Sequence, residues 1–437
     1  MAAQQSTNMS HKRTDNDSAP RLDLVVIGNG MAGLRVVEDL LEIAPERYNI
    51  TVFGAEPHAS YNRIMLSPVL AGDKDFAEIQ TRDRDWYADN HITLHTGEAV
   101  VDIDRRRRMV ISDTGREVGY DRLVLATGSS PFILPVPGHT LDGVISFRDI
   151  GDVDRMVKAS ANGGKAVVIG GGLLGLEAAY GLHKRGMDVT VVHLMGSLME
   201  RQLDPTAAEL LQYSLAQRGL SFKMGAKTAA ILGDEDQGVI GLRFEDADHS
   251  TLDAKLVVMA IGIRPNIELA KKAGLHCDKG IVVNDTMQSF DPRIYAVGEC
   301  VEHRQAVYGL VAPLWDQAKV CANHLAYRGH CHYDGSVTAT QLKVTGIDMY
   351  SAGDFAESDD TDTLVYADVR RGVYKRIVLR ENRIQGLVLY GDTRDGGWYF
   401  KQMQAGTDVS ARRDLLLFGQ AYLADDNGED ALHQVAA

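Results

Sequence analysis

The sequence predicts an α/β protein in which one strand–turn–helix–strand unit occurs twice and a small α+β domain follows. Three observations predict this class. Apolar runs at residues 22–27 and 166–169 each lead directly into a glycine-rich turn and a helical pattern of apolar residues. From about residue 335 the pattern changes to short strand-like runs separated by polar turns. The length of 437 residues also exceeds the roughly 250–300 residues at which a single core stops growing, so we expect two or three domains.

The first unit consists of a strand at 22–27, a helix at 34–43 and a second strand at 50–53 that ends near Glu56. In a turn between such a strand and helix, the first glycine permits the tight bend. The second lets the backbone approach a pyrophosphate, and the third lets helix and strand pack closely. The helix N-terminus offers free N–H groups to the phosphates. A carboxylate at Glu56 can accept hydrogen bonds from the hydroxyls of an adenosine ribose. The candidate dinucleotide contacts of this turn are Gly28, Asn29, Gly30, Ala32 and Gly33.

The second unit repeats the pattern, with strands at 166–169 and 189–192. His193 stands at the end of its second strand, where an acid would favour NADH over NADPH. One interpretation is that the missing carboxylate admits a 2′-phosphate, to which Arg201 or Lys184 would contribute a cation. The other is that His193 is a neutral residue that contacts the ribose. The choice between NADH and NADPH stays open, with NADH favoured. The candidate contacts of this turn are Gly170, Gly172, Leu173, Leu174 and Gly175.

Three further strands end in candidate site residues. The apolar runs at 123–128 and 256–262 end in small residues, and each completes one of the two units. A third run, at 294–299, ends at a carboxylate. The candidate cofactor contacts on these strands are Thr127, Gly128, Gly262, Gly298 and Glu299.

Composition and charge argue against several classes of protein. With 60 acidic and 46 basic residues, the net charge of −14 argues against binding to nucleic acid or to an anionic membrane. The four cysteines form no CxxC pair, which excludes a Cys-only metal site and argues against a disulfide framework, and the 14 histidines show no metal-ligand spacing. No apolar run reaches the ~18 residues of a membrane span. Residues 1–20 are polar and lack the apolar centre of a secretory signal, so we expect a cytoplasmic protein.

Three short strings carry a family resemblance: Ala126-Thr127-Gly128-Ser129, Gly262-Ile263-Arg264-Pro265-Asn266 and Tyr295-Ala296-Val297-Gly298-Glu299. Together with the two glycine turns, they resemble the two-dinucleotide flavoprotein family, which includes the pyridine nucleotide–disulfide oxidoreductases and the ferredoxin reductases. The resemblance implies two Rossmann-like domains, of which the first binds FAD and the second binds NAD(P)H. It also implies that Glu299, where Asp is usual, binds the ribityl chain of FAD.

Longer strings resemble one branch of that family. They occupy residues 61–68, 192–204, 343–346, 351–355, 370–375 and 389–393. They are similar to the N-terminal flavoprotein half of the large subunit of assimilatory NAD(P)H nitrite reductases, and to related nitrate reductase electron-transfer subunits. With this resemblance the chain divides into a disordered leader at 1–21, an FAD-binding domain at 22–140 and 266–334 that is interrupted by an NAD(P)H-binding domain at 141–265, a C-terminal α+β interface domain at 335–420 and a polar tail at 421–437.

The chain departs from this family at some positions. Residues 61–70 contain no cysteine, so disulfide chemistry is not expected. Pro68 stands where ferredoxin reductases commonly carry a lysine near the flavin. This leaves Arg63, which either stabilises negative charge on the reduced ring or is an exposed loop residue. Glu177 either reaches the nicotinamide pocket, as in the family, or lies on a solvated helix face. Because the cofactors carry out hydride transfer, we expect no catalytic side chain in the strict sense.

The resemblance implies an electron-input module. The full-length large subunits continue into a cysteine-bearing cluster domain and a sirohaem/iron–sulfur domain, and this chain has no motif for either. We therefore expect an FAD-dependent reductase that takes hydride from NAD(P)H and passes electrons to a separate metal-containing partner in nitrate or nitrite assimilation. The expected partner is the catalytic subunit of a nitrate or nitrite reductase, or a small iron–sulfur protein. Two alternatives stay open: a rubredoxin- or ferredoxin-type reductase with another acceptor, and a flavin-bound redox-sensing regulator.

Overall fold

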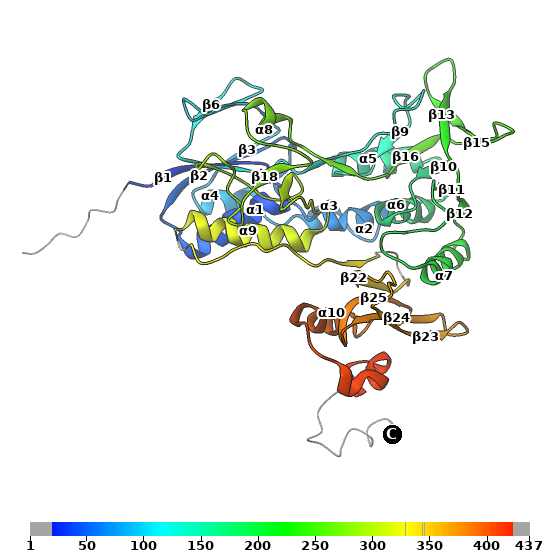
Figure 1. Cartoon of the computed structure of the whole chain (residues 1–437). Coiled ribbons are helices and arrows are strands. Elements are labelled where there is room, and N and C mark those ends of the chain that lie inside the picture. The colour runs from blue at the N-terminus through cyan, green and yellow to red at the C-terminus, as the bar shows by residue number, and fades with distance from the viewer. Residues whose placement is uncertain (1–19, 328, 343, 345, 423–437) are drawn as a thin grey trace, which may run out of the picture.

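The computed structural model describes residues 20–422 except 328, 343 and 345. All but two residues of the expected leader, and all but two of the expected tail, lie outside the described residues. Two parallel sheets lie side by side in the upper part of Figure 1, and the C-terminal sheet lies below them. Within the part of the chain that the structure describes, no helix is long and apolar enough to cross a membrane.

The first unit is a five-stranded parallel sheet, in the order β19 (Ile294–Ala296), β7 (Arg122–Leu125), β1 (Leu22–Ile27), β2 (Tyr48–Gly54) and β3 (Thr93–Thr96). β1 is apolar because it lies between two neighbouring strands, with helices beside the sheet. The other elements of this unit are α1 (Met31–Ile43), η1 (Arg63–Met65), α2 (Leu66–Ala71), α3 (Phe76–Ile79), α4 (Arg84–Asp89), β4 (Val100–Asp104), β5 (Met109–Ser112), β6 (Glu117–Gly119), β8 (Ser129–Pro131), β17 (Ile263–Pro265), α8 (Glu268–Lys272), β18 (Ile281–Val283), β20 (Val301–His303) and α9 (Val311–Leu325).

The second unit is another five-stranded parallel sheet, in the order β12 (Ser221–Lys223), β11 (Met187–Val192), β10 (Gly164–Ile169), β16 (Leu256–Met259) and β9 (Val144–Ser146). It is inserted into the first unit, because β19 follows the whole second unit in the chain and completes the first sheet. β8 pairs antiparallel with β17 where the chain passes between the units. The other elements are α5 (Ile150–Ser160), α6 (Leu173–Lys184), α7 (Pro205–Ala216), β13 (Thr228–Gly233), β14 (Val239–Phe244) and β15 (Thr251–Asp253).

The C-terminal part is a five-stranded antiparallel sheet, in the order β21 (Ala339–Gln341), β22 (Met349–Gly353), β25 (Arg383–Tyr390), β24 (Val373–Arg380) and β23 (Asp362–Asp368). α10 (Gly396–Ala405), η2 (Ser410–Phe418) and η3 (Gln420–Tyr422) follow it. β21 is short, and the chain then turns at Gly346, whose φ is +75°, between the bridged residues Val344 and Ile347. It returns as β22, which no sequence signal identified as a strand, since its glycine, alanine and serine have weak strand propensity.

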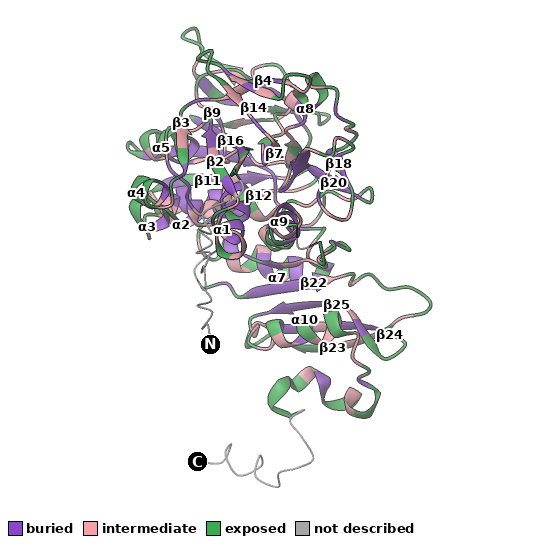
Figure 2. Cartoon of the chain, turned by 90° about the vertical axis from the view of Figure 1, so that its left-hand side faces the viewer, coloured by how far each residue is buried: buried purple, intermediate pink, exposed green. Residues whose placement is uncertain are grey.

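The C-terminal sheet packs directly against the second unit. Tyr374 and Tyr390 belong to the same buried cluster as residues of α7, and Figure 2 shows buried segments of β22 and β25 below that helix. The hydroxyl of Tyr374 donates to Asp204 Oδ2 at 2.8 Å, and that of Tyr390 donates to Ser214 Oγ at 2.6 Å. The C-terminal domain therefore shares a core with the second unit, and removing it would expose that core.

Candidate functional site

In the glycine turn between β1 and α1, neighbouring backbone atoms leave no room for a side chain at two of the glycines, which we call closed. A third glycine faces free space, and we call it open. Gly28 has a φ of +113°, and a Cβ there would overlap the carbonyl oxygen of Ala126. A Cβ at Gly33 would overlap the carbonyl oxygen of Gly28. At Gly30, the N-cap of α1, a Cβ would meet no atom within 4 Å, and no side chain caps the helix. The N–H groups of the first turn of α1 can therefore bind an anion in front of Gly30.

The turn between β10 and α6 has the same construction. Gly170 has a φ of +122°, and a Cβ there would overlap the carbonyl oxygen of Ala260. A Cβ at Gly175 would overlap the carbonyl oxygen of Gly170. Gly172 is the N-cap of α6, and a Cβ there would meet no atom within 4 Å. The structure thus has two turns of equivalent geometry, one in each unit, and each leaves room for an anion at the N-cap glycine of its helix.

Three other candidates of the second unit lie close to this turn. Leu173 and Leu174 are the first residues of α6, and Leu174 is 40% exposed. Gly262 follows β16 with a φ of +116°, two residues after Ala260, which closes the turn. The structure brings these residues together at the carboxyl end of the second sheet, where ligands of open α/β sheets bind.

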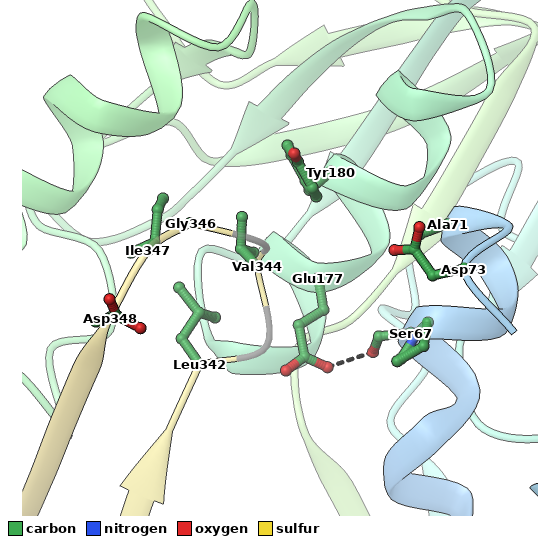
Figure 3. A pocket seen from close by; sticks show the side chains of 11 residues that line it. Ser67, Ala71, Asp73, Glu177, Tyr180, Leu342, Val344, Gly346, Ile347 and Asp348 are labelled. Carbon is green, nitrogen blue, oxygen red and sulfur yellow. Dashed lines mark hydrogen bonds between the residues drawn. The ribbon is translucent and has the colours of Figure 1, made fainter. Parts of the chain in front are cut away.

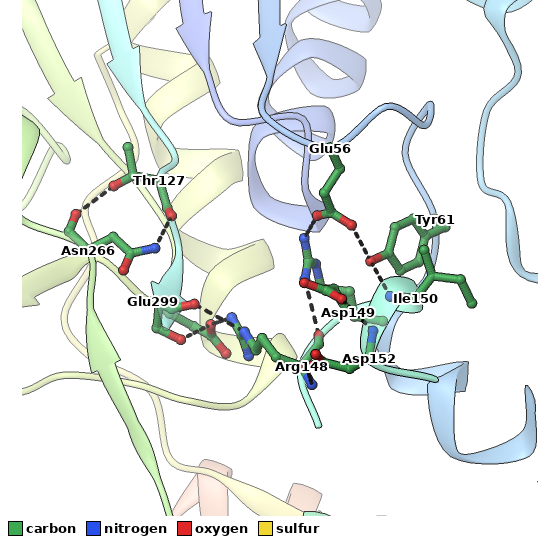
Figure 4. Close-up of polar contacts among 11 residues, drawn as sticks. Glu56, Tyr61, Thr127, Arg148, Asp149, Ile150, Asp152, Asn266 and Glu299 are labelled. Carbon is green, nitrogen blue, oxygen red and sulfur yellow. Dashed lines mark hydrogen bonds and ion pairs between the residues drawn. The ribbon is translucent and has the colours of Figure 1, made fainter. Parts of the chain in front are cut away.

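Glu56 and Arg63 meet just beyond the carboxyl end of β2. Tyr61 donates its hydroxyl to Glu56 Oε2 at 2.6 Å, and Arg63 forms an ion pair with Glu56 Oε1 (Figure 4). Burial raises the pKa of Tyr61, so its hydroxyl remains a donor. Arg63 also donates to the carbonyl oxygen of Arg148 at 3.2 Å. Arg63 is therefore a paired, partly buried residue, and the alternative of a freely exposed loop arginine is wrong.

Glu299 has a matching arrangement beyond the end of β19. It forms an ion pair with Arg148 and accepts a hydrogen bond from Ser129 Oγ at 2.7 Å (Figure 4). Arg148 is held in place by a hydrogen bond from its Nε to the carbonyl oxygen of Ser129 at 3.1 Å. The side chains of Glu299 and Arg148 are only 14% and 17% exposed. The two acids of the first unit are thus each paired with an arginine, and Arg148, which follows β9 of the second unit, also accepts the hydrogen bond from Arg63 through its carbonyl oxygen.

Hydrogen bonds across the two connections between the units position Thr127 and Gly128. Thr127 Oγ1 donates to the carbonyl oxygen of Asn266 at 2.8 Å, and Asn266 Nδ2 donates to that of Thr127 at 2.9 Å (Figure 4). The backbone N–H of Asn266 donates to Gly128 at 2.9 Å. The inserted unit is thereby fixed to the first unit beside the ends of β7 and β17.

Two buried amide groups near the first turn have unused donors. Gly298 has a φ of +94°, and a Cβ there would lie 3.0 Å from the side chain of Ala32. Its N–H donates to Gln317 Oε1 at 2.8 Å, while Gln317 Nε2 is buried and has no partner among the described residues. Asn29 accepts from Tyr87, whose pKa burial raises to about 12, and Asn29 Nδ2 is likewise buried without a partner within residues 20–422. Buried donors are normally satisfied, so both amides fit contacts to a bound group.

These residues fit the parts of a dinucleotide. The open turn at Gly30 suits a diphosphate, because α1 directs its N–H groups there. The carboxylates of Glu56 and Glu299 suit sugar or ribityl hydroxyls, and the buried amides suit acceptor atoms. In the described ranges, no cluster of three or more His, Cys, Asp or Glu side chains could hold a metal ion.

His193 directly follows β11, as the sequence predicted, but it is not the register equivalent of Glu56. When the paired residues of β1–β2 and β10–β11 are aligned, His193 corresponds to Gly54, and Met195 corresponds to Glu56. His193 Nδ1 accepts the N–H of Gly171 at 3.1 Å. His193 Nε2 lies 3.1 Å from Glu200 Oε2. The second unit therefore has an acid near its turn, contributed by a later segment.

Glu177 is buried between the two units. It is 5% exposed, and Ser67 Oγ donates to its Oε2 (Figure 3). The two side chains line a cavity of about 290 Å³ between α2, α6 and the segment before β22, with Leu342 and Ile347 on the opposite side. The alternative of a solvated glutamate on a helix face is therefore wrong.

Comparison with known proteins identifies the family. The chain matches the pyridine nucleotide-disulphide oxidoreductase family over residues 22–323 and the C-terminal domain of rubredoxin NAD+ reductase over residues 339–407. Because the first match covers more than half of the sequence, the chain belongs to that oxidoreductase family. This confirms the expected class of enzyme and its cofactors, FAD and NAD(P)H.

Two curated relatives come from Bacillus subtilis strain 168. Nitrite reductase [NAD(P)H] is 52% identical over 387 residues, which cover 89% of this chain and 48% of the relative. The assimilatory nitrate reductase electron transfer subunit is 45% identical over 394 residues, which cover 90% of this chain and 51% of the relative. The chain thus spans about half the length of each. Among solved structures, the covalent putidaredoxin reductase–putidaredoxin complex matches with a TM-score of 0.81 at 27% identity, over 92% of this chain and 99% of the matched chain.

Proposed function

We propose that this chain is an FAD-dependent reductase that takes electrons from NAD(P)H and delivers them to a metal-containing acceptor outside the chain, in nitrate or nitrite assimilation. The observation that carries the proposal is the pair of equivalent turns, each open at a single N-cap glycine, Gly30 or Gly172. The names of the two Bacillus subtilis relatives support the choice of pathway.

FAD, when bound, supplies the redox chemistry: it accepts hydride from NAD(P)H and passes electrons on singly. The residues of this chain bind FAD and NAD(P)H and orient the two cofactors. The N–H groups of α1 in front of Gly30 hold the diphosphate of FAD, and those of α6 in front of Gly172 hold the diphosphate of NAD(P)H. Glu56 accepts hydrogen bonds from the adenosine ribose of FAD, and Glu299 accepts them from its ribityl chain.

Arg63 and Arg148 offset the charges of these acids. Each arginine is paired with one carboxylate, so the four side chains have no net charge together. A diphosphate that approaches the turn is therefore not repelled by Glu56 and Glu299, as it would be by two unpaired acids. Glu177 on α6 accepts a hydrogen bond from Ser67 on α2, and we assign it to the nicotinamide pocket.

A second candidate function is reduction of rubredoxin or a ferredoxin. It is favoured by the match of residues 339–407 to the C-terminal domain of rubredoxin NAD+ reductase. The chemistry at FAD is the same in both candidates, and only the acceptor differs. A third possibility, a regulator that holds FAD as a ligand, predicts binding without rapid electron transfer.

The acceptor can be identified with the purified FAD-loaded chain under anaerobic conditions. We expect NADH to reduce ferricyanide rapidly and nitrite to remain unconsumed until a sirohaem nitrite reductase is added. The same mixture with rubredoxin or a [2Fe–2S] ferredoxin serves as the comparison. Faster turnover with either small protein would favour the second candidate. Failure to reduce ferricyanide despite bound FAD and NADH would overturn the proposal and leave the regulator.

A further inference from the structure

The end of β11 differs from the end of β2 in how it can recognise a ribose. The first unit places Glu56 two residues beyond Gly54, whereas the equivalent position in the second unit is Met195. The side chain of Met195 is 48% exposed and apolar. A ribose-binding carboxylate in the second unit must therefore come from elsewhere in the chain.

Glu200 is fixed beside the second turn by the residues before it. The N–H of Met199 donates to the carbonyl oxygen of Gly171 at 3.0 Å. Leu198 is fully buried, and its side chain lies against Gly171, where a Cβ would be 2.7 Å from it. Gly171 immediately precedes the open residue Gly172. The segment that carries Glu200 is thus attached to the turn itself.

His193 orients the carboxylate of Glu200. Since His193 Nδ1 accepts the N–H of Gly171, the ring hydrogen of the neutral form is on Nε2 and is donated to Glu200 at 3.1 Å. His193 is 11% exposed and Glu200 is 35% exposed, so the imidazole is enclosed while the carboxylate reaches solvent. A carboxylate that accepts one hydrogen bond still has capacity for others.

We infer that Glu200, oriented by His193, is the carboxylate that selects NADH over NADPH. This inference rests on the proposed binding of NAD(P)H at the second turn. The carboxylate accepts a hydrogen bond from the 2′-hydroxyl of the adenosine ribose and repels a 2′-phosphate at the same place. His193 is a positioning residue in this arrangement.

Two lysines of the second unit do not offset this charge: Lys184 is the last residue of α6, about 18 Å along the helix from the turn, and Lys223 lies against an aromatic ring. Lys184 pairs with Asp73 at 2.5 Å, and the ammonium of Lys223 lies 4.6 Å from the ring centre of Phe244. The corresponding sequence prediction, in which Lys184 supplies a cation for a 2′-phosphate, is not supported by this placement. Arg201, which the sequence analysis also considered as a cation for a 2′-phosphate, is exposed. The test below therefore includes an Arg201 variant.

The test compares the binding of ADP-ribose and of its 2′-phosphate to the FAD-loaded chain by calorimetry, which needs no turnover. We expect the wild-type protein to bind ADP-ribose at least about tenfold more tightly. Glu200→Gln should lower this ratio about tenfold, and Glu200→Lys should reverse the preference. His193→Ala should lower the ratio severalfold while FAD content stays unchanged. Asp188→Asn is the matched control, because Asp188 is an exposed acid on β11, about 16 Å along the strand from His193.

The outcomes separate this inference from the function on which it rests. An unchanged ratio in both Glu200 variants would overturn the role of Glu200. A wild-type preference for the 2′-phosphate that Arg201→Gln removes would overturn it in favour of an arginine site. Undiminished binding of both ligands to Gly172→Val would instead show that the second turn is not the nucleotide site, which contradicts the proposed function.

Discussion

A valine at Gly30 should remove FAD and leave the fold intact. The backbone of Gly30 has φ −82° and ψ −174°, which is extended and accessible to any residue, and a Cβ there meets no atom within 4 Å. At an N-cap, replacing glycine by an apolar residue costs up to about 1 kcal/mol of folding free energy. The loss of backbone entropy in the unfolded chain offsets about 0.4–1 kcal/mol of this. The free energy of unfolding should therefore change by less than about 1 kcal/mol.

The effect on FAD should be much larger than the effect on folding. The added methyl groups occupy the space through which a diphosphate reaches the N–H groups of α1. We expect FAD affinity to fall about a hundredfold or more, which corresponds to ~2.7 kcal/mol. The assay is the flavin-to-protein ratio after gel filtration, with urea unfolding as the measure of stability.

Two matched variants make this test specific. Gly172→Val has the same geometry in the second unit, so it should keep FAD and lose nicotinamide nucleotide binding. Gly28→Ala should instead lose the fold, because its Cβ would overlap a backbone carbonyl oxygen. A Gly30→Val protein with the flavin content of the wild type would refute the assignment of the first turn.

Two further predictions concern stability. Tyr374→Phe removes the hydrogen bond to buried Asp204 and should lower the free energy of unfolding by about 1–3 kcal/mol in urea titration, with ferricyanide reduction unchanged at low urea; an unchanged midpoint would contradict the shared core. Hydrogen bonds from Ser112 and Thr114, helped by Arg116, lower the pKa of Glu98 from 4.5 to about 2. Ionised Glu98 therefore stabilises the fold above about pH 4.5, and this contribution disappears as the pH falls toward 2. Glu98→Gln should flatten that part of the acid-unfolding curve measured by circular dichroism, and an identical curve would count against it.

The shared core also changes the interpretation of a truncation. The expectation of a separate interface domain suggests cutting the chain at Gly335 and testing partner-dependent turnover. Such a cut would remove Tyr374 and Tyr390 from the core that they form with α7. Loss of every activity would then report unfolding, so single surface substitutions are the better test of a docking role.

The glycine turns could be predicted because their signal is local. A buried strand, a spaced set of glycines and a helix lie within one short segment, and the structure places Gly28, Gly30 and Gly33 at the positions that close or open the turn. Even there the helix begins at Met31, three residues before the expected start, because Gly30 is already its N-cap. The first turn of this helix contains Ala32 and Gly33, which are too small to contribute to the pattern of large apolar residues that predicted the helix.

The partners of the candidate acids could not be predicted in the same way. Arg148 reaches Glu299 across 151 positions of sequence, and no motif surrounds it. Gln317 is buried on α9 and contacts Gly298 only because that helix packs beside the first turn. Glu200 required the strand register and the bond between Met199 and Gly171, neither of which the sequence specifies.

The central claim is that electrons pass from NAD(P)H through FAD to an acceptor outside the chain, and rapid mixing under anaerobic conditions tests it most directly. We predict that NADH bleaches the flavin absorbance of the wild-type protein, and that ferricyanide added in a second mixing step restores it. Gly172→Val should retain the flavin and fail to bleach. If the bound flavin of the wild-type protein stays oxidised in the presence of saturating NADH and NADPH, the account is contradicted.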